Sequence, residues 1–564
     1  MPVFLSPGLS DMPDALMQDI LWKYTPLGGG TIAHRAGENI LNKPYLLGIN
    51  CLSSDIICIL LAAIKQLAGQ TLWYGVTNIG AKFLNYLLTP LLTYLMADTS
   101  GVRDYGEYSL LYSWIAVVNI IFTYGFETGY FRFSSTKEVD RDSLFQTAFG
   151  SLLISTIGLI LLFSFFRVSI NNFMNLAGHT EYIIWCLFLI GWDSLCTIPF
   201  ARLRQENRPK RYAFVKLAGI VINILFTVIF LVGLPKYSAG HPADIISKWY
   251  SSNNRVGFLL LANMLQNFFV FLILFKEWKK IRFKIDRRLW KQLFFYSAPM
   301  IFIGLAGMIN EVMDRQMLAR FLPAGTDAKS VVGIYSANYK LAIFITLFIQ
   351  AFKMAAEPFF FNQSKEQHAP GLYARVMKWF VITLSVAFLF STLYLDVWQY
   401  LVGPSYRSGL GVVPILLFAN ICLGIYYNLS IWYKLTDRMR SGLNITVFGA
   451  LITLAGNYFF IPHWGMYASA WTTLVCYASM VMITYFMGQK YFPVSYPVKR
   501  IVTYLLIMLV FFFVKLSVNT LSDSWTITKQ LSLRLSVATL LMASYILLLM
   551  RIERAELKAL LKGK

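Results

Sequence analysis

Apolar residues recur in long runs along most of this chain. From Lys65 onward, runs of about 20 residues alternate with short polar turns, and an apolar helix of about 20 residues spans the ~30 Å hydrocarbon core of a bilayer. The pattern therefore predicts an all-α, polytopic membrane protein with about fourteen transmembrane helices. The centres of the predicted helices fall near residues 84, 117, 156, 192, 223, 265, 306, 342, 386, 422, 452, 479, 509 and 541.

The composition excludes a water-facing globule. Apolar residues make up 57% of the 564 residues, charged residues make up 14%, and the mean hydropathy is +0.57, so polar side chains are too few to cover a globule of this size. The six Cys contain no C-x-x-C pair, and none of the five His lies deep in an apolar run. Neither a zinc site nor a disulfide framework is predicted, and we expect no cofactor.

Basic residues are concentrated in the polar turns. The formal net charge of +22 would suit a nucleic-acid partner, but most Lys and Arg lie in short turns between apolar runs. The turn FKEWKKIRFKIDRRLWK, residues 275–291, holds eight of them. Because short basic loops stay cytoplasmic, these charges predict orientation and contact with membrane lipids, and no nucleic acid. Basic loops near 137, 207, 284, 365, 437 and 495 and a basic tail predict that both termini are cytoplasmic.

A short internal repeat divides the predicted helices into two halves. Gly106-Glu107-Tyr108-Ser109 opens the second predicted helix, and Gly333-Ile334-Tyr335-Ser336 opens the eighth. Six helices separate the motifs, so the halves share one orientation, as in parallel repeats related by a pseudo-twofold axis along the membrane normal. The predicted parts are an N-terminal extension at 1–65, either loose or a misassigned start, an N-lobe of six helices at 66–280, a basic cytoplasmic linker at 281–292, a C-lobe of six helices at 293–492, and helices thirteen and fourteen with a basic tail at 493–564.

Ionisable residues inside the predicted helices are the candidates for function, because the loops are too short to form an extramembrane domain. A charge at the bilayer centre costs about 2.5–3.5 kcal/mol on insertion scales, so such residues normally face the protein interior or water. Lys82 and Lys340 lie deep in their helices. Lys82 either lines a cavity or pairs with a carboxylate such as Asp193. Asp193 is in turn either a protonatable or ion-binding carboxylate or half of a buried salt bridge.

A second group of charges lies in the seventh helix and at two helix ends. Glu311 and Arg315 are i, i+4 neighbours that can neutralise each other, which leaves Asp314 to face either the central cavity or the outer headgroups. Glu127 and Glu357 close the second and eighth helices on the cytoplasmic side, where a gating or structural role is favoured over substrate contact. The substrate-binding candidates are Lys82, Lys340 and Arg315, and the coupling or gating candidates are Asp193, Glu311, Asp314, Glu127 and Glu357. No catalytic or metal-binding residue is predicted, and the candidate coupling ions are H⁺ and Na⁺.

Five short motifs occur in the order typical of one transporter family. They are LAGQTLWYG (67–75), YGEYSLLYS (105–113), MDRQML (313–318), VGIYSANYKL (332–341) and IPHWGMYASA (461–470). With these motifs the chain resembles the polysaccharide-export and O-antigen flippases, whose superfamily also contains the MATE exporters and the lipid II flippase. It departs from the family pattern in its N-terminal extension and in having fourteen predicted helices where many relatives have twelve.

The resemblance implies two lobes that form a V around a partly cationic cavity in a bacterial inner membrane. It also implies an undecaprenyl-diphosphate-linked oligosaccharide as substrate, for surface polysaccharide assembly, with polysaccharide-assembly proteins as candidate partners. One alternative is a MATE-like ion-coupled exporter of small cations, which needs an acidic cavity and is disfavoured by the deep Lys82. Another is a polyprenyl-linked glycosyltransferase or polymerase, which usually needs a sizeable outer loop or an acidic motif there.

Overall fold

Long apolar helices dominate the part of the chain that the structure describes. In this computed structural model, thirteen helices are long and apolar enough to cross a membrane, and the shorter apolar helix Tyr86–Leu95 lies where the first was predicted. The all-α polytopic prediction is confirmed. The count of fourteen stays a prediction, because most of the first predicted helix and the whole extension at 1–65 lie outside the described residues. The structure describes residues 80, 84 and 86–556, apart from 135–138, 175, 177–178, 243, 251–254, 280–284, 364–368, 437 and 523–526.

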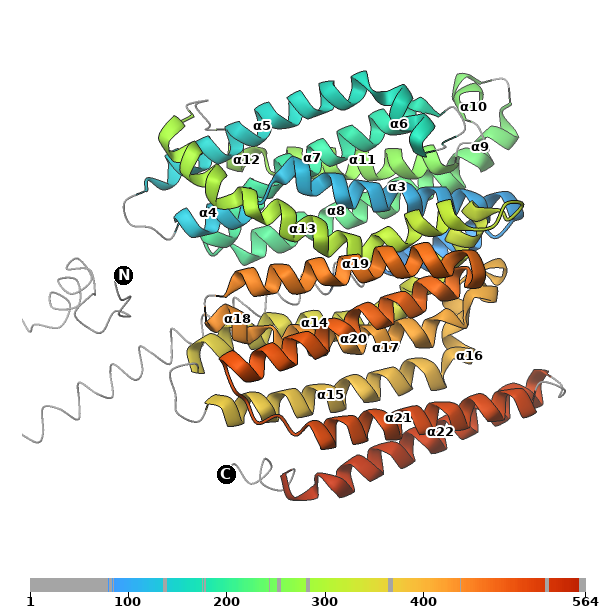
Figure 1. Cartoon of the computed structure of the whole chain (residues 1–564). Coiled ribbons are helices and arrows are strands. Elements are labelled where there is room, and N and C mark those ends of the chain that lie inside the picture. Colours follow the sequence, from blue (N-terminus) through green and yellow to red (C-terminus); the bar gives the residue numbers. More distant parts are fainter. Residues whose placement is uncertain are drawn as a thin grey trace, which may run out of the picture. The chain divides into compact units, whose positions relative to one another are not determined.

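The membrane-length helices follow one another with few interruptions (Figure 1). They are α3 (Thr99–Thr123), continued by α4 (Phe126–Ser134), then α5 (Arg141–Phe165), α7 (Thr180–Gln205), α8 (Pro209–Val228), α11 (Arg255–Ile273), α13 (Arg287–Phe321), α14 (Ala328–Gln363), α15 (Ala369–Leu393), α17 (Val412–Leu429), α19 (Met439–Trp464), α20 (Met466–Tyr491), α21 (Val498–Leu521) and α22 (Ile527–Ile552). The shorter elements are α6 (Arg167–Met174), η2 (Ile229–Gly233), α9 (Leu234–Gly240), α10 (Ile245–Trp249), α12 (Phe275–Trp278), α16 (Leu395–Trp398), η3 (Gln399–Leu401), η4 (Pro404–Gly409) and α18 (Ile431–Leu435).

Local sequence signals set where several helices begin and bend. Asp98, Asp140 and Asp286 immediately precede α3, α5 and α13, and each carboxylate accepts a hydrogen bond from a backbone N–H of the first turn. These are N-caps, which satisfy donors that lack a partner within the helix. The second span bends where α3 ends, because Tyr124 and Gly125 have φ values of +32° and +73°. A left-handed pair of this kind stops a helix, and the chain resumes as α4.

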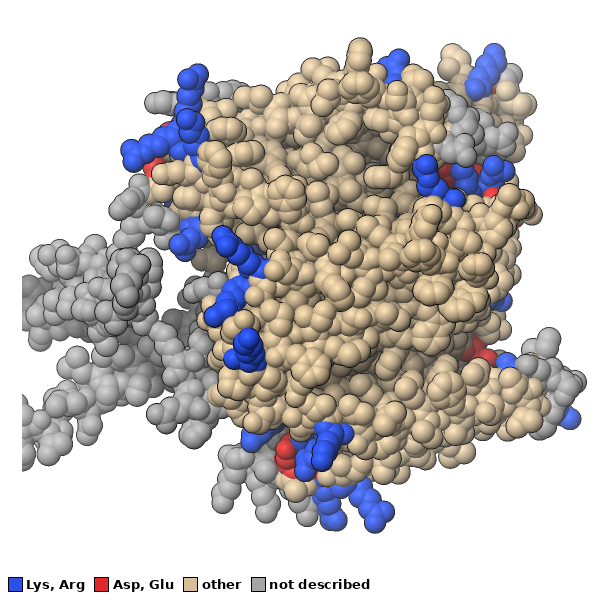
Figure 2. All heavy atoms as spheres, in the orientation of Figure 1, with Lys and Arg blue, Asp and Glu red and all other residues tan. Residues whose placement is uncertain are grey.

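The helices alternate in direction, so their loops collect at two ends. We call the end at which α5, α13 and α19 begin the basic end, because Arg141, Arg287 and Arg440 lie there. The opposite end, at which α3, α14 and α20 begin, is called the far end. On the face shown in Figure 2, most Lys and Arg lie towards the two ends and leave a largely uncharged band between them. The positive-inside tendency predicts that the basic end is cytoplasmic.

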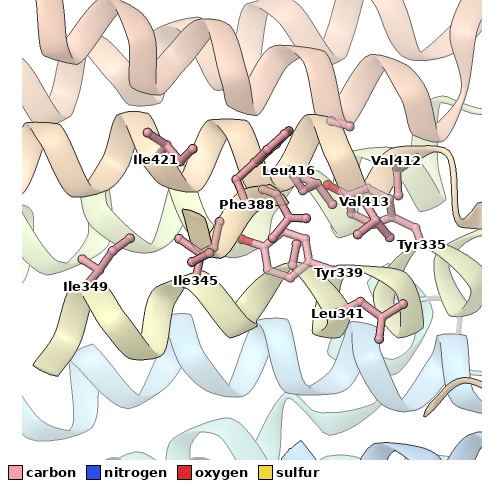
Figure 3. Packing of buried hydrophobic residues seen from close by; sticks show 14 of the residues in the cluster. Tyr335, Tyr339, Leu341, Ile345, Ile349, Phe388, Val412, Val413, Leu416 and Ile421 are labelled. Carbon is pink, nitrogen blue, oxygen red and sulfur yellow. The ribbon is translucent and has the colours of Figure 1, made fainter. Parts of the chain in front are cut away.

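Helices α13 and α14 connect the first and second halves of the sequence. Helix α14 packs against α3 on one side and α17 on the other, and α13 packs against α3, α4 and α19. The largest cluster of buried apolar residues includes side chains of α14, α15 and α17. Figure 3 shows Tyr339 and Ile345 of α14 on the side of Leu416 of α17, with Phe388 of α15 beside them. Helices α21 and α22 pack against α15 and against each other. The twofold relation between the halves stays a prediction.

Candidate functional site

A cavity of about 860 Å³ lies among α13, α14, α17, α18, α19 and α20. Its lining begins near the middle of the helices, at Glu311 and Lys340, and continues to Tyr433 and Met439 at the basic end. The cavity therefore extends from the middle of the predicted membrane to the basic end. Tyr86, from the helix Tyr86–Leu95, also lines it. Side chains from both predicted halves thus face one cavity.

Three charged side chains line this cavity. Lys340, Glu311 and Lys353 are all exposed, although Lys340 and Glu311 lie in the middle of membrane-length helices. In the described part of the chain, neither Lys340 nor Glu311 forms an ion pair. The ammonium of Lys353 lies 4.5 Å from the centre of the Tyr427 ring, a cation–π contact. Because a charge at this depth normally faces water or a partner, we infer that the cavity admits water, and its lining has a cationic excess.

Tyrosines and amides form much of the remaining wall. Tyrosine combines an aromatic face with a hydroxyl, which suits contacts with sugars. The amide of Asn420 donates to the Ala342 carbonyl at 3.0 Å, and the amide of Asn310 donates to the Thr446 carbonyl at 3.1 Å. These two amides therefore join neighbouring helices, as polar side chains often do in membranes. The tyrosines that line the cavity are Tyr86, Tyr339, Tyr426, Tyr427, Tyr433 and Tyr477.

Arg315 lies behind the cavity wall and not in its lining. Its guanidinium forms an ion pair with the neighbouring Asp314 at 3.1 Å and lies 4.3 Å from the centre of the Tyr339 ring. Asp314 is buried and also accepts a hydrogen bond from the Tyr335 hydroxyl at 2.6 Å. The expected pairing of Arg315 with the Glu311 carboxylate is therefore not seen, because Arg315 donates to the backbone carbonyl of Glu311 and not to its side chain. Asp314 is the paired carboxylate, and Glu311 is the one left open to the cavity.

The other predicted candidates lie away from this cavity or outside the described residues. Asp193 of α7 accepts a hydrogen bond from the amide of Asn119 of α3 at 3.0 Å. Glu127 forms an ion pair with Arg204, which supports a structural role at the basic end. Lys82 and its predicted pairing with Asp193 lie outside the described residues. Glu357 lies in α14, but its side chain is not among those described.

The far end of the interface between α3 and α14 is tightly closed. A Cβ on Gly106 would overlap the backbone carbonyl of Lys329, and a Cβ on Gly333 would overlap that of Val102. The glycines of the internal repeat thus let the two helix backbones touch, because neither carries a side chain. The ammonium of Lys329 forms an ion pair with Glu107 at 2.5 Å across the same contact. The contact between α3 and α14 is therefore closed at the far end.

Sequence reasoning missed two buried charge clusters that fasten α21 and α22. At the basic end, Lys378 of α15 pairs with Glu553, which follows α22, at 2.7 Å, and each side chain is 3% exposed. Towards the far end, Lys515 of α21 pairs with Asp396 of α16 at 3.0 Å. Both lysines are almost fully buried, so each needs its carboxylate partner. The sequence signal that could have predicted these ion pairs is the presence of opposite charges at similar depths in different apolar helices.

Comparison with known proteins assigns the chain to a family. The family model for polysaccharide biosynthesis proteins matches residues 67–363, which is more than half of the chain. The chain belongs to the polysaccharide biosynthesis protein family. The family resemblance predicted from the motifs is confirmed. The matched segment of this polysaccharide biosynthesis protein includes the glycine contact between α3 and α14 as well as Glu311 and Lys340.

Individual relatives agree with this assignment. The chain is 21% identical over 438 residues to Lsg locus putative protein 1 of Haemophilus influenzae, covering 74% of this chain and 96% of the relative. Its fold is similar to that of the lipid II flippase MurJ in an inward closed conformation, with a TM-score of 0.63, 15% identity, and coverage of 84% of this chain and 98% of MurJ. It is also similar to an inward-facing multidrug resistance MATE family transporter, with a TM-score of 0.52, 12% identity, and coverage of 72% and 93%. This polysaccharide biosynthesis protein is therefore a multi-pass membrane protein with the fold seen in these transporters.

Proposed function

We propose that this protein is a flippase that moves a polyprenyl-diphosphate-linked oligosaccharide across the bacterial inner membrane, for surface polysaccharide assembly. In this proposal it is a transporter and not an enzyme, both termini are cytoplasmic, and polysaccharide-assembly proteins supply and receive the glycan. The observation that carries the proposal is the mid-membrane cavity, which presents Lys340, Lys353 and several tyrosines and extends to the basic end. The family assignment supports the same conclusion.

The chemistry of a diphosphate explains why such a cavity is needed. Moving an ion from water into hydrocarbon has an idealised cost of about 20 kcal/mol per charge. Lys340 and Lys353 offer ammonium groups that can replace part of the lost hydration, and the tyrosines offer hydroxyls and ring faces to the sugars. The polyprenyl chain needs no such replacement and stays in lipid. A cavity with two cations and one carboxylate suits this substrate better than the small cations of a MATE-like exporter.

Alternating access is the proposed mechanism of transport. The cavity extends to the basic end while Gly106 and Gly333 hold the far end closed. Rocking of the two predicted lobes would separate α3 from α14 and open the same cavity to the far end. Glu311 is the proposed coupling carboxylate, because it is exposed in the cavity beside the cation Lys340, with H⁺ and Na⁺ as the candidate ions.

Substitution of Lys340 tests the proposed substrate contact. Lys340→Met keeps much of the stem length and removes the charge, whereas Lys340→Arg keeps the charge. We expect Lys340→Met to lower surface-glycan export by at least about tenfold, equivalent to ~1.4 kcal/mol, with unchanged abundance in the membrane, and Lys340→Arg to retain part of the export.

The matched control is Lys216→Met. Lys216 lies on α8, outside the cavity lining, with its ammonium 4.3 Å from the centre of the Phe200 ring. The Lys216→Met variant should leave surface-glycan export unchanged. Full glycan export by a stably expressed Lys340→Met variant would refute the proposed role of this cavity.

A further inference from the structure

A second cavity, of about 860 Å³, opens at the far end between the first and second halves of the fold. Its walls are α3 from Arg103 to Trp114, the short helix α6, the last turns of α13 and the turn that leads into α14. It lies at the opposite end of the helices from Tyr433 and Met439, where the substrate cavity reaches the basic end. The charged residues in its lining are Arg103, Arg320, Lys329 and Asp327.

Two of these four charges are already satisfied within the protein. Lys329 pairs with Glu107 at 2.5 Å, and Asp327 accepts a hydrogen bond from the Ser330 hydroxyl at 2.7 Å. Arg103 and Arg320 are both exposed, and in the described part of the chain neither forms a hydrogen bond or an ion pair. The guanidinium carbon of Arg320 lies 5.6 Å from the centre of the Phe173 ring. The cavity therefore presents two guanidinium groups whose donors remain available.

An apolar pocket adjoins these arginines. It has a volume of about 220 Å³ and lies among α3, α5, α6 and α7. Trp114, Phe173 and Met174 line both this pocket and the charged cavity, so the two spaces are neighbours. Every side chain in the lining of the smaller pocket is apolar, aromatic or sulfur-containing. The apolar pocket thus lies next to the charged cavity, whose two arginines form no ion pair in the described part of the chain.

We propose that these neighbouring spaces bind an anionic phospholipid from the far-end leaflet. Guanidinium groups form paired, charge-assisted hydrogen bonds with phosphate oxygens, so Arg103 and Arg320 hold the phosphodiester. One acyl chain enters the apolar pocket, and Trp114, which lines both spaces, lies where they meet. The two arginines belong to α3 and α13, so the lipid bridges the two halves of the fold. The bound lipid therefore stabilises the far-end-closed state.

Lipid binding can be measured by native mass spectrometry of the full-length, delipidated protein. Phosphatidylglycerol and phosphatidylcholine with identical acyl chains are the probes, because they share the apolar part and differ in net charge. We expect the wild-type protein to bind phosphatidylglycerol at least about tenfold more tightly, equivalent to ~1.4 kcal/mol. The Arg103→Gln/Arg320→Gln double variant should lose this preference. Arg167→Gln, which changes an exposed arginine of α6 outside the cavity lining, should keep it.

A second pair of variants tests the acyl-chain pocket. Ile170 lines the pocket from α6, whereas Val168 of the same helix is 56% exposed and does not line it. Ile170→Trp should fill the pocket and weaken phosphatidylglycerol binding several-fold, while Val168→Trp should leave binding unchanged. Because α6 is a short connecting helix, both variants are expected to fold. The thermal unfolding midpoint of each variant checks this.

Three results would overturn the assignment. They are equal binding of the two phospholipids by the wild-type protein, an unchanged preference in the double arginine variant, and displacement of phosphatidylglycerol by equimolar undecaprenyl phosphate. The last result would assign the arginines to a polyprenyl phosphate instead of a membrane phospholipid. The glycan-export measurement on Lys340 is independent of all three, so either proposal can fail alone.

Discussion

At the scale of single residues, ionisable side chains in the membrane-length helices fall into two groups. Asp314, Arg315 and Lys378 are held by oppositely charged or hydrogen-bonding partners. Glu311 and Lys340 are exposed in the cavity without an ion pair in the described part of the chain. Depth in the sequence identified Lys340, but the i, i+4 spacing assigned Arg315 to Glu311, whereas the structure pairs Arg315 with Asp314. Residues three or four apart share one face of a helix, so their spacing alone does not show which carboxylate faces the cavity.

This division predicts different effects for two neighbouring carboxylates. Asp314→Asn removes the partner of Arg315 and should cost about 3–5 kcal/mol of stability, because it leaves a buried charge unpaired. Asp314→Asn should therefore lower the thermal unfolding midpoint and the abundance in the membrane, and the double variant Asp314→Asn/Arg315→Met should recover much of both.

Glu311→Gln is the matched comparison. It should leave abundance unchanged, because Glu311 has no ion-pair partner in the described part of the chain to strand. It should nevertheless weaken the response of glycan export to ionophores that collapse the H⁺ or Na⁺ gradient. If Asp314→Asn proved as stable as wild type, the assignment of Asp314 as the buried, paired carboxylate would be wrong.

At the scale of elements, hydrophobic run length predicted the helices well and their partners poorly. Thirteen described helices lie where apolar runs were found, because the bilayer thickness fixes how long a spanning helix must be. The position of α21 and α22 against α15 could not be predicted in this way, since run length carries no information on neighbours. Lys378 with Glu553 and Lys515 with Asp396 provide this information in the structure.

The cluster at the basic end can be tested by neutralising one member. Lys378→Met removes the 2.7 Å partner of the buried Glu553, which keeps Arg500 at 3.9 Å. We therefore expect a loss of about 1.5–3 kcal/mol in the free energy of unfolding. The double variant Lys378→Met/Glu553→Gln should recover most of this loss. Lys499→Met changes an exposed lysine in the first turn of α21 and should have little effect. Thermal unfolding midpoints in one detergent give the comparison, and equal midpoints for Lys378→Met and Lys499→Met would show that this ion pair does not fasten the hairpin.

At the scale of the whole molecule, the two glycines of the internal repeat make a contact that the sequence did not predict. Gly106 and Gly333 were predicted to be equivalent positions in two lobes, and in the structure they also lie against each other at the far end. Their spacing predicted a repeat, but contact between the two glycines depends on how α3 and α14 pack. The shape and lining of the cavity could not be predicted for the same reason, because its walls come from helices distant in sequence.

The central claim is that a lipid-linked oligosaccharide moves through the cavity when α3 and α14 separate at the far end. The most direct measurement is transport by proteoliposomes that carry a Glu107→Cys/Lys329→Cys variant, with the six native Cys replaced by Ser. Glu107 and Lys329 are paired across this contact, so a short bifunctional thiol reagent can join the two cysteines. The substrate is the lipid-linked glycan extracted from the producing cells.

The account predicts that the untreated variant transports this substrate, that cross-linking stops transport, and that cleavage of the cross-link restores it. The Glu107→Cys single variant, treated with the same reagent, should continue to transport. Transport by the cross-linked protein at the untreated rate would contradict the account.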